Sequence, residues 1–423
     1  MSDIAIIGTG YVGLTTGAFL AHVGHQVVCA DVDPKKIDML SRGEMPIFEP
    51  GLDELVREGI DTGRLTFMLG AARAAAKAEF VFLCVQTPQG DDGSADLSYI
   101  ETAAAEISPV LQSDTVVINK STVPVGSTLV VERALGRSDV KVVSNPEFLR
   151  EGSAVHDCFH PDRIVIGSEH HGAAIRVASL YESVKAPQLI TDPASAETIK
   201  YASNAFLATK ISFVNAIANV CEAVGADVRE VVLGMGYDKR IGFEFLHPGP
   251  GWGGSCFPKD THALVRIAED SGYDFDLLRG VIAVNDAQKD RIVEKIVASA
   301  GGSIAGKTIA IWGLTFKART DDRRSSPSLD IAGRLRALGA TIQAYDPTVT
   351  SDLDGITVCA DAYGACEGAS VVAVLTEWDE FRWLDFGKAR AAMAEGNLVD
   401  ARNLLDPAAV RRKGFLYTGV GRA

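Results

Sequence analysis

Apolar and polar positions follow one another in a regular order along the first part of the chain. A short apolar run over residues 3–8 precedes a glycine-rich turn, a helical pattern that stops at Gly24, and a second apolar run over 26–31. Three further runs of strand length, with helical segments between them, cover residues 79–85, 115–120 and 140–145. Strands that alternate with helices predict the α/β class, with a doubly wound and mostly parallel sheet.

The pattern changes in the middle of the chain, where residues 195–228 contain no proline and a single glycine near the end. Apolar positions recur there at helical spacing, which predicts one long helix. Such a helix can join two domains and offer a dimer surface, or it can be an ordinary core helix. The sequence leaves both interpretations open.

A second α/β pattern starts near Gly306. The segment KTIAIWGLTFK, a helical stretch around 327–338 and the segment ATIQAYDP repeat the order of the opening residues. Gly313 stands alone where the first unit has three glycines, which indicates a related fold with a different phosphate ligand. We therefore expect two Rossmann-like, doubly wound domains joined by a long central helix, with the parts at residues 1–194, 195–300 and 301–423.

Composition narrows the possible partners and the location. The 423 residues suit two or three domains, and 55 acidic against 41 basic side chains give a formal charge of −14, which discourages binding to nucleic acid or to an anionic membrane. We find no signal-like N-terminus and no apolar run that looks long enough to cross a bilayer, so we expect a cytoplasmic protein. The seven cysteines show no CxxC pair, which predicts reduced thiols and no metal site.

The first turn has the spacing of a dinucleotide-binding motif. Gly8, Gly10 and Gly13 follow a predicted strand and open a predicted helix, where glycines allow a tight turn, close approach to a pyrophosphate and helix packing. Asp31 ends the next strand, where a carboxylate binds ribose hydroxyls and repels a 2′-phosphate. This pattern predicts NAD rather than NADP. Lys36 is either a ribose contact or a solvated helix residue.

Two hydroxyl side chains follow later strands. Thr87 and Thr122 come at the carboxyl ends of the runs over 79–85 and 115–120, where open α/β sheets bind ligands. Both are therefore candidates to line the nicotinamide pocket. A turn hydroxyl is the alternative, because a proline follows each of them closely.

A glycine-rich segment leads into Cys256 and a predicted helix. Ser255 is typical of an N-cap, and Pro258 is tolerated in a first helical turn. The helix N-terminus and the nearby Lys259 ammonium favour a nucleophilic thiolate at Cys256, and Asp260 follows one turn later as a base or its orienter. With a nicotinamide cofactor, such a thiol predicts oxidation through a thiohemiacetal to a thioester that water hydrolyses to an acid. A buried structural thiol in a tight turn is the alternative.

The chain resembles the UDP-glucose/GDP-mannose dehydrogenase family over essentially its full length. The motifs that carry the resemblance are GTGYVGL at 8–14, CVQTP at 84–88, STVPVGS at 121–127, NPEFLREGSAVHD at 145–157, PDRIVIG at 161–167, GPGWGGSCFPKD at 249–260 and GLTFKARTDDRRSSPS at 313–328. The thiol segment is more similar to the form that oxidises UDP-glucose than to the GDP-mannose form. The resemblance thus implies an NAD-dependent oxidation of UDP-glucose to UDP-glucuronate for polysaccharide biosynthesis, by a homodimer or larger homo-oligomer.

The resemblance also implies roles for individual residues. Cys256 would form the thiohemiacetal and the thioester, while Lys200 and Asn204, one turn apart on the long helix, would hold the developing oxyanion. Water and proton transfers would fall to Glu147, Asp260 and Thr122. The cofactor contacts would be Gly8, Gly10, Val12, Gly13, Asp31, Lys36, Thr87, Thr122, Glu151, Lys259 and Arg324.

The implied substrate contacts come from distant segments. They are Glu147, Phe148, Leu149, Arg150, Glu151, Lys200, Asn204, Arg240, Phe245, Leu246, His247, Pro248, Gly249, Gly253 and Lys317. Among them, Arg240 corresponds to an arginine that family dimers supply to the neighbouring subunit. Cations gathered in this way would supply the positive charge that an anionic ligand needs in an acidic chain. Two departures from the family pattern, Ala318 and Ser325, affect only fine contacts near the diphosphate.

Three alternatives differ in function. The same chemistry on GDP-mannose or UDP-N-acetylmannosamine would be decided by the pocket around 245–253. A one-step β-hydroxyacid-type dehydrogenase would share the Rossmann domain and the lysine–asparagine pair, but it would leave Cys256 without a task. A catalytically silent protein that binds NAD or a nucleotide-sugar is the third alternative, which an assay distinguishes.

Overall fold

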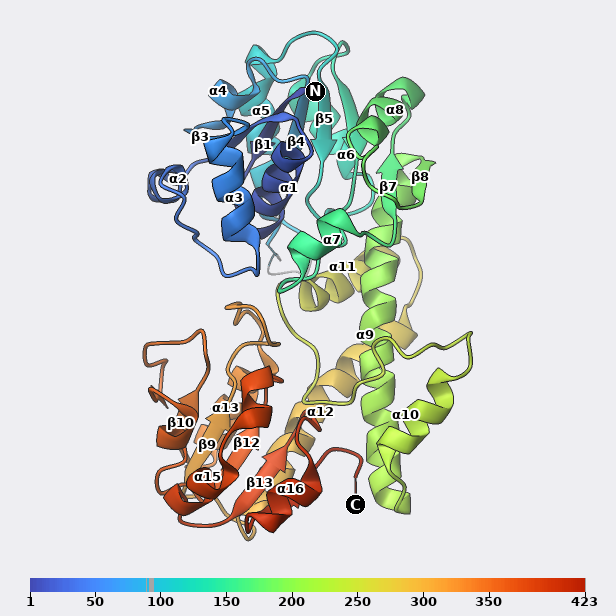
Figure 1. Ribbon diagram of the computed structural model, residues 1–423. Coiled ribbons are helices and arrows are strands. Elements are labelled where there is room, and N and C mark those ends of the chain that lie inside the picture. The colour runs from blue at the N-terminus through green and yellow to red at the C-terminus, as the bar shows by residue number, and fades with distance from the viewer. Residues whose placement is uncertain (89, 91–94, 423) are drawn as a thin grey trace. The chain divides into compact units, whose positions relative to one another are not determined.

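The computed structural model describes residues 1–88, 90 and 95–422, so the last residue of the expected C-terminal part, Ala423, lies outside the described residues. The chain divides into two compact units. Unit 1 contains residues 1–203 and 262–272, and unit 2 contains residues 204–261 and 273–423. Each unit has its own sheet and its own core (Figure 1).

Unit 1 is a doubly wound α/β domain. Within the described residues its sheet has the strand order β3-β2-β1-β4-β5-β6-β7-β8, and all pairings are parallel except that of β6 with β7. The strands are β1 (Asp3–Ile7), β2 (Gln26–Asp31), β3 (Leu65–Leu69), β4 (Phe80–Leu83), β5 (Val116–Asn119), β6 (Lys141–Ser144), β7 (Ile164–Gly167) and β8 (Gln188–Thr191). Strand order reverses between β1 and β4, so the ends of these two strands form the switch point where such sheets bind ligands.

Helices cover both faces of this sheet. They are α1 (Tyr11–His22), α2 (Pro34–Ser41), α3 (Leu52–Asp61), α4 (Ala71–Ala75), α5 (Ser98–Ile107), the 3-10 turn η1 (Ser108–Val110), α6 (Ser127–Leu135), α7 (Ala154–Phe159) and α8 (His171–Ser179). Buried side chains of α1, α3 and α8 pack on one face, and those of α4, α5 and α6 pack on the other. The inner strands β1, β4, β5 and β7 are buried on both faces and therefore apolar, whereas the edge strands β3 and β8 are partly exposed.

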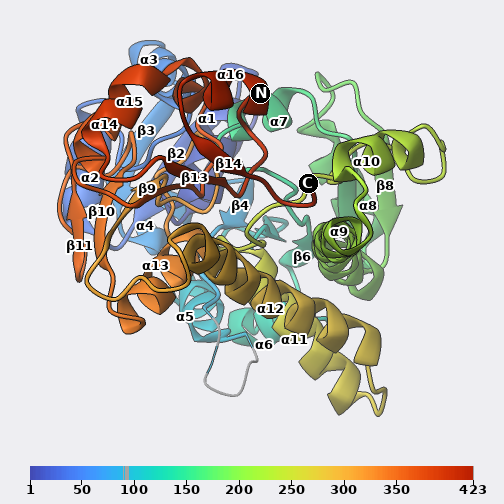
Figure 2. The same ribbon diagram turned by 90° about the horizontal axis from the view of Figure 1, so that it is seen from below.

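Unit 2 repeats this architecture. Its sheet has the order β11-β10-β9-β12-β13-β14, from the strands β9 (Thr308–Trp312), β10 (Thr341–Tyr345), β11 (Ile356–Val358), β12 (Val371–Val374), β13 (Asn397–Asp400) and β14 (Leu416–Thr418). Its other elements are α10 (Val228–Gly236), α12 (Asp276–Ser299), α13 (Pro327–Ala337), α14 (Ala362–Ala365), η2 (Asp379–Trp383), α15 (Phe386–Ala392) and α16 (Pro407–Arg412). Figure 2 shows α12 and α13 on one side of this sheet and α14 and α15 on the other.

The two sheets share the geometry of their first turn. Gly8 and Gly313 both have a positive φ, of 101° and 95°, and each backbone N–H donates to the carbonyl of the neighbouring strand at 2.8 Å. The carboxylates of Asp31 and Asp346, which end or follow that neighbouring strand, accept hydrogen bonds from the residues just after the glycines. The expectation of two Rossmann-like domains is therefore confirmed.

A long helix, α9 (Pro193–Val224), is shared by the two units in sequence, as is α11 (Phe257–Asp270). The side chain of Asp192 accepts a hydrogen bond from the Ser195 N–H at 2.8 Å, so α9 begins two residues earlier than expected, with Pro193 in its first turn. It also ends earlier, before Gly225 with its φ of 74°, and α10 starts as a separate helix. The predicted single helix to residue 228 was wrong at that end.

By length and composition alone, α9 would suffice to cross a membrane, which corrects the expectation that no apolar run is long enough. In its most apolar window 33% of the residues are buried inside the structure. A single helix of this kind is weak evidence for a membrane span, because core helices of soluble proteins meet the same criteria.

Candidate functional site

The three glycines of the first turn differ in what surrounds them. A Cβ on Gly8 would lie 2.6 Å from the Cys84 carbonyl oxygen, and one on Gly13 would lie 1.9 Å from the Gly8 carbonyl oxygen. A Cβ on Gly10 would meet nothing within 4 Å. The first and third glycines therefore allow packing of the turn, while the space beside Gly10 and the N–H groups of α1, which starts at Tyr11, fit a dinucleotide pyrophosphate.

These distances separate two alanine substitutions. We expect Gly10→Ala to keep the melting temperature of the wild type, because Gly10 has an ordinary φ of −72°, but to weaken NADH binding by about 10-fold or more. We expect Gly13→Ala to lower the melting temperature by several degrees, because its Cβ overlaps a backbone oxygen. Fluorescence titration with NADH and thermal unfolding check both results. Wild-type NADH affinity in Gly10→Ala would rule out the pyrophosphate position.

The Asp31 carboxylate is held in place by hydrogen bonds at the end of β2, where a Rossmann-like domain binds a ribose. Its Oδ2 accepts hydrogen bonds from the Thr9 N–H at 2.9 Å and the Thr9 hydroxyl at 2.6 Å, and the Lys36 ammonium lies 3.9 Å away. Burial acts to raise the pKa of Asp31, but the bonds from Thr9 outweigh it and hold that pKa below its usual value. The carboxylate is thus ionised at neutral pH and can accept from ribose hydroxyls, while Lys36 contributes one nearby positive charge.

The two threonines at the strand ends lie together. The Thr87 hydroxyl donates to the backbone carbonyl of Thr122 at 2.8 Å, and both residues are buried. The hydroxyl of Ser121 donates to the Val85 carbonyl at 2.6 Å. These bonds tie the loop after β4 to the loop after β5, close to the switch point of the sheet. The bond of the Thr87 hydroxyl fits a turn as well, so the place of the two threonines in a nicotinamide pocket stays a prediction.

A buried ion pair lies beyond the end of β6. The ammonium of Lys200, on α9, donates to the backbone carbonyl of Glu147 at 2.7 Å and to its Oε1 at 2.8 Å, and both side chains are 5% exposed. Burial would raise the pKa of Glu147, but Lys200 outweighs this effect and keeps that pKa below its usual value. The pair therefore supplies a fixed carboxylate and a fixed ammonium in a place from which most water is excluded.

The segment 147–151 lies outside helices and strands, and side chains from within it and around it hold it in place. The Leu149 N–H donates to the Glu147 Oε2 at 2.7 Å, and Arg150 pairs with Asp157 at 2.5 Å. Arg163 stacks on the Phe148 ring at 3.6 Å from its centroid, and the Lys200 ammonium lies 5.5 Å from the same centroid. The predicted substrate contacts of unit 1 are thus a rigid set.

The predicted residues of unit 2 form a second cluster. The side-chain N–H of Asn204 donates to the Asp260 Oδ2 at 2.6 Å, and the Lys259 ammonium donates to the Asp260 Oδ1 at 2.6 Å. Asp260 is almost completely buried. Asn204 lies four residues after Lys200 in α9, so the two residues project from the same side of the helix.

Cys256 immediately precedes α11, which starts at Phe257. Its carbonyl accepts the first helical bond, from the Asp260 N–H at 2.9 Å, so Cys256 itself takes the N-cap position that the sequence suggested for Ser255. Its thiol is partly exposed and lies 3.6 Å from the Ser255 hydroxyl. In contrast, Cys29 and Cys84 are buried and burial raises the pKa of Cys84 to about 12, so they are inert core thiols.

The loop before Cys256 fits closely against other parts of unit 2. A Cβ on Gly253 would lie 2.0 Å from the Ser325 carbonyl oxygen, so only glycine is tolerated there. Both the N–H and the carbonyl of Trp252 bond to the Asn285 side chain, at 2.8 and 3.0 Å. Phe245 has a φ of 62°, a conformation that is unusual for its side chain. The backbone of this loop is therefore fixed from both sides.

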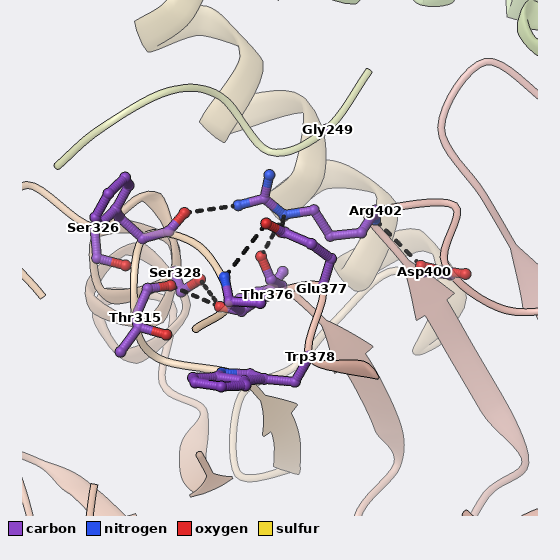
Figure 3. A network of polar contacts seen from close by, with 12 residues as sticks. Gly249, Thr315, Ser326, Ser328, Thr376, Glu377, Trp378, Asp400 and Arg402 are labelled. Atoms are coloured by element: carbon purple, nitrogen blue, oxygen red, sulfur yellow. Dashed lines mark hydrogen bonds and ion pairs between the residues drawn. The ribbon is translucent and has the colours of Figure 1, made fainter. Parts of the chain in front are cut away.

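The carboxyl ends of β9, β12 and β13 carry a network of polar contacts (Figure 3). The Arg402 guanidinium donates to the carbonyls of Leu375 and Phe316 at 2.8 and 2.9 Å and pairs with Glu377 at 3.0 Å. A Cβ on Gly249 would lie 3.3 Å from the Arg402 Nη1. The predicted loop 245–249 thus reaches the strand ends where a Rossmann-like sheet binds phosphate ligands.

Of the other predicted cations of unit 2, Arg324 and Arg240 are exposed and Lys317 is partly buried. Arg324 pairs with Asp322 at 2.7 Å, and the Lys317 ammonium lies 5.5 Å from the Phe316 ring centroid. The Arg240 side chain is 89% exposed and pairs with Asp238. The remaining predicted contacts in this unit are a buried Leu246, an exposed His247 and a partly buried Pro248. Among the described residues, no group of three or more His, Cys, Asp or Glu side chains could hold a metal ion.

Several polar residues of these clusters were missed in the sequence. Arg163 lies within a motif that carried the resemblance but was given no role, and Asn285 and Arg402 lie in segments without any motif. Lys120 is buried and donates to the side chain of Asn145, two residues before Glu147, at 3.0 Å. In the sequence, Lys120 could have been noticed only as a charged residue at the end of an apolar strand, where a lysine is unusual.

Comparison with known proteins identifies the family of the chain. Residues 2–185, 194–287 and 310–407 match three domain models of the UDP-glucose/GDP-mannose dehydrogenase family, those of its NAD binding, central and UDP binding domains. The chain is 47% identical to a UDP-glucose 6-dehydrogenase of Bacillus subtilis, with 99% of this chain and 98% of the relative covered, and 46% identical to one of Rhizobium meliloti, with 99% of each covered. The structure of a UDP-glucose dehydrogenase from Pyrobaculum islandicum superimposes with a TM-score of 0.92 at 37% identity, over 100% of this chain and 98% of that one. The chain belongs to the UDP-glucose/GDP-mannose dehydrogenase family.

Proposed function

We propose that this chain oxidises the primary alcohol of UDP-glucose to the carboxylate of UDP-glucuronate, with NAD as the oxidant. The observation that carries the proposal is the partly exposed Cys256 thiol at the start of α11, one turn before the buried pair of Asp260 and Asn204. A dehydrogenase that made only an alcohol–carbonyl conversion would have no use for such a thiol. The names of four relatives at 44–47% identity support UDP-glucose as the substrate.

The residues that would hold the cofactor are those of the glycine turn, with Val12, Asp31 and Lys36 for the adenosine half and Thr87 and Thr122 for the nicotinamide half. Glu151, Lys259 and Arg324 would complete its contacts. Two NAD molecules, bound one after the other, would each accept one hydride, one for each of the two oxidations. The carboxylate of Asp31 would exclude a 2′-phosphate by charge repulsion, which favours NAD over NADP.

The chain's own residues would divide the remaining chemistry. The Cys256 sulfur adds to the carbonyl carbon made in the first oxidation, and the second oxidation turns this thiohemiacetal into a thioester. Water then adds to the thioester carbonyl, the carbon–sulfur bond breaks, and the thiol is restored as the acid leaves. The Lys200 ammonium and the Asn204 amide stabilise the oxyanion on the reacting carbon.

Two carboxylates would handle the protons. Glu147 is kept ionised by Lys200, so it can accept a proton from the attacking water, either directly or through Thr122. Asp260 lies between the Asn204 amide and the Lys259 ammonium, so its charge is held in place one turn after Cys256. From there it can take the proton of the thiol or return it.

The segments 147–151 and 245–249, with Gly253 and Lys317, would bind the nucleotide-sugar. A panel of nucleotide-sugars tests the substrate, since GDP-mannose and UDP-N-acetylmannosamine dehydrogenases share the chemistry. We expect kcat/KM for UDP-glucose to exceed the values for GDP-mannose and UDP-N-acetylmannosamine by about 100-fold or more. A higher kcat/KM for either of the other two sugars would overturn the substrate and leave the chemistry intact.

We also propose that the chain acts as a homodimer through α9. Phe206, Phe213, Val220 and Val224 are exposed apolar side chains at helical spacing in this helix, and α10 lies beside it (Figures 1 and 2). A second copy would bury this stripe, and it would bring the exposed Arg240 to its neighbour's diphosphate.

We expect Phe213→Glu to shift the mass in solution toward a monomer, whereas the same change at the exposed Leu416 in β14 should leave it unchanged. A wild-type mass for Phe213→Glu would contradict the interface.

For the chain as a whole, we propose the three-part organisation at residues 1–194, 195–300 and 301–423 and a place in the cytoplasm. Dimer formation through the α9 stripe would give its apolar side chains a protein partner in place of a bilayer. The partners proposed are therefore the small-molecule substrate and a second copy of the chain, not nucleic acid or a membrane. The uronic acid product would serve polysaccharide biosynthesis.

A further inference from the structure

One buried carboxylate of unit 1 has no part in the chemistry described above. Glu49 lies in the loop before α3 and is 5% exposed. Its Oε1 accepts a hydrogen bond from the Ala154 N–H at 2.7 Å, and its Oε2 accepts one from the Gly152 N–H at 2.6 Å. Its Oε2 also accepts a hydrogen bond from the Tyr11 hydroxyl. A buried carboxylate with this many donors fixes the groups around it.

Tyr11 belongs to the glycine turn. It is the first residue of α1, between Gly10 and Val12, and its hydroxyl also lies 3.1 Å from the Arg150 carbonyl oxygen. Burial raises the pKa of Tyr11 far above its usual value, so the hydroxyl keeps its proton and remains a donor. One side chain of the cofactor turn therefore contacts the segment that carries the predicted sugar contacts.

That segment is fixed at both ends. At its start, Lys200 holds the side chain and the backbone carbonyl of Glu147. At its end, Glu49 holds the N–H groups of Gly152 and Ala154, and α7 packs on α1 with the Phe159 and Phe19 rings 5.2 Å apart. Without the second anchor, the segment would keep the Lys200 contacts of Glu147, the Arg163 stacking on Phe148 and the Arg150–Asp157 pair, but it would lose its hydrogen bonds to the loop before α3.

We propose that Tyr11 and Glu49 are positioning residues, which hold the segment 147–152 against the cofactor turn so that the sugar and the cofactor are bound in a fixed relation. The inference rests on the proposed function, because it takes 147–151 as substrate contacts. Glu49 touches neither ligand; it acts through the backbone of Gly152 and through the Tyr11 hydroxyl. Its effect falls on the affinity for the sugar nucleotide rather than on the affinity for the cofactor.

The test uses the full-length enzyme with Tyr11→Phe, Glu49→Gln and the double variant. Tyr11→Phe removes only the hydroxyl, and Glu49→Gln can place an amide N–H against the Gly152 N–H. We expect the KM for UDP-glucose to rise by about 10-fold in each single variant, with the dissociation constant for NADH alone within about 3-fold of the wild type. The KM of the double variant should be no higher than that of the poorer single variant, because both changes affect the same hydrogen bond, from the Tyr11 hydroxyl to Glu49.

Tyr99→Phe is the matched control, since Tyr99 is exposed on α5 and the described structure gives its hydroxyl no hydrogen bond. An unchanged KM for UDP-glucose in Tyr11→Phe, or effects that multiply in the double variant, would overturn the proposal. If Glu49→Gln did not fold, Tyr11→Phe would decide, because the buried ring remains. If the wild type made no NADH from UDP-glucose, the proposed function would fail, and calorimetric binding of UDP-glucose to Tyr11→Phe would still test the bridge.

Discussion

Cys256→Ser should reduce the formation of UDP-glucuronate by at least about 10³-fold while NADH binds with nearly wild-type affinity. A serine hydroxyl at the start of α11 is a much weaker nucleophile than a thiol, so the hemiacetal and ester that would replace the thiohemiacetal and thioester would form and turn over far more slowly. The cofactor residues are those of the glycine turn and Asp31, which the substitution leaves unchanged. Steady-state production of the acid and a fluorescence titration with NADH measure the two quantities.

The control is Cys359→Ser, which changes a second partly exposed thiol of the same unit. This variant should keep wild-type turnover, since Cys359 follows β11 and is given no part in the reaction. Wild-type production of the acid by Cys256→Ser would contradict the covalent mechanism. If Cys256→Ser lost NADH binding as well as turnover, the role of Cys256 would be structural rather than catalytic.

Lys200→Ala should lower kcat by about 10²–10³-fold, with a much smaller change in the dissociation constant for NADH. The variant loses the ammonium that stabilises the oxyanion. It also leaves the buried Glu147 carboxylate without its ion pair, which favours the protonated form. The residual activity should therefore require a higher pH than the wild type, because the base must be ionised. Stopped-flow measurement of NADH formation across a pH series checks both effects.

The free energy of unfolding should also differ between wild type and Lys200→Ala in a pH-dependent way, with the larger difference at neutral pH. Lys200 holds the pKa of Glu147 below its usual value, so the pair stabilises the native state above the pKa that Glu147 has in the unfolded chain. This stabilisation is lost as the pH falls through the lower, folded-state pKa, and it is missing at every pH in the variant. The matched control is Lys185→Ala, at an exposed position of unit 1. A large loss of NADH affinity with a normal kcat would contradict the placement of Lys200.

The parts that could be predicted from the sequence are those that local patterns determine. The strand over 26–31 ends at Asp31 as expected, because an apolar run, a glycine before it and a carboxylate after it are all set by neighbouring residues. The glycine spacing of the first turn was informative for the same reason, since Gly8 and Gly13 meet backbone within the same unit, while the position of Gly10 is open. The repeat of this turn at Gly313 was visible in one short segment.

The parts that could not be predicted depend on contacts between distant segments. Glu49 lies 103 residues before Gly152, to which it bonds, and Arg402 lies 86 residues after Phe316. Nothing in the neighbouring residues of Glu49 distinguishes it from a solvated loop carboxylate. The early end of α9 was also missed, because helical spacing continues across Gly225 into α10 although the backbone does not.

The yield of NADH per molecule of UDP-glucose consumed tests the central claim most directly. The account predicts two NADH for each UDP-glucose at complete conversion, with UDP-glucuronate as the product, because the aldehyde stays bound to Cys256 between the two oxidations. One NADH per UDP-glucose, with a free aldehyde in solution, would contradict it, since the thiol would then have no part in the reaction.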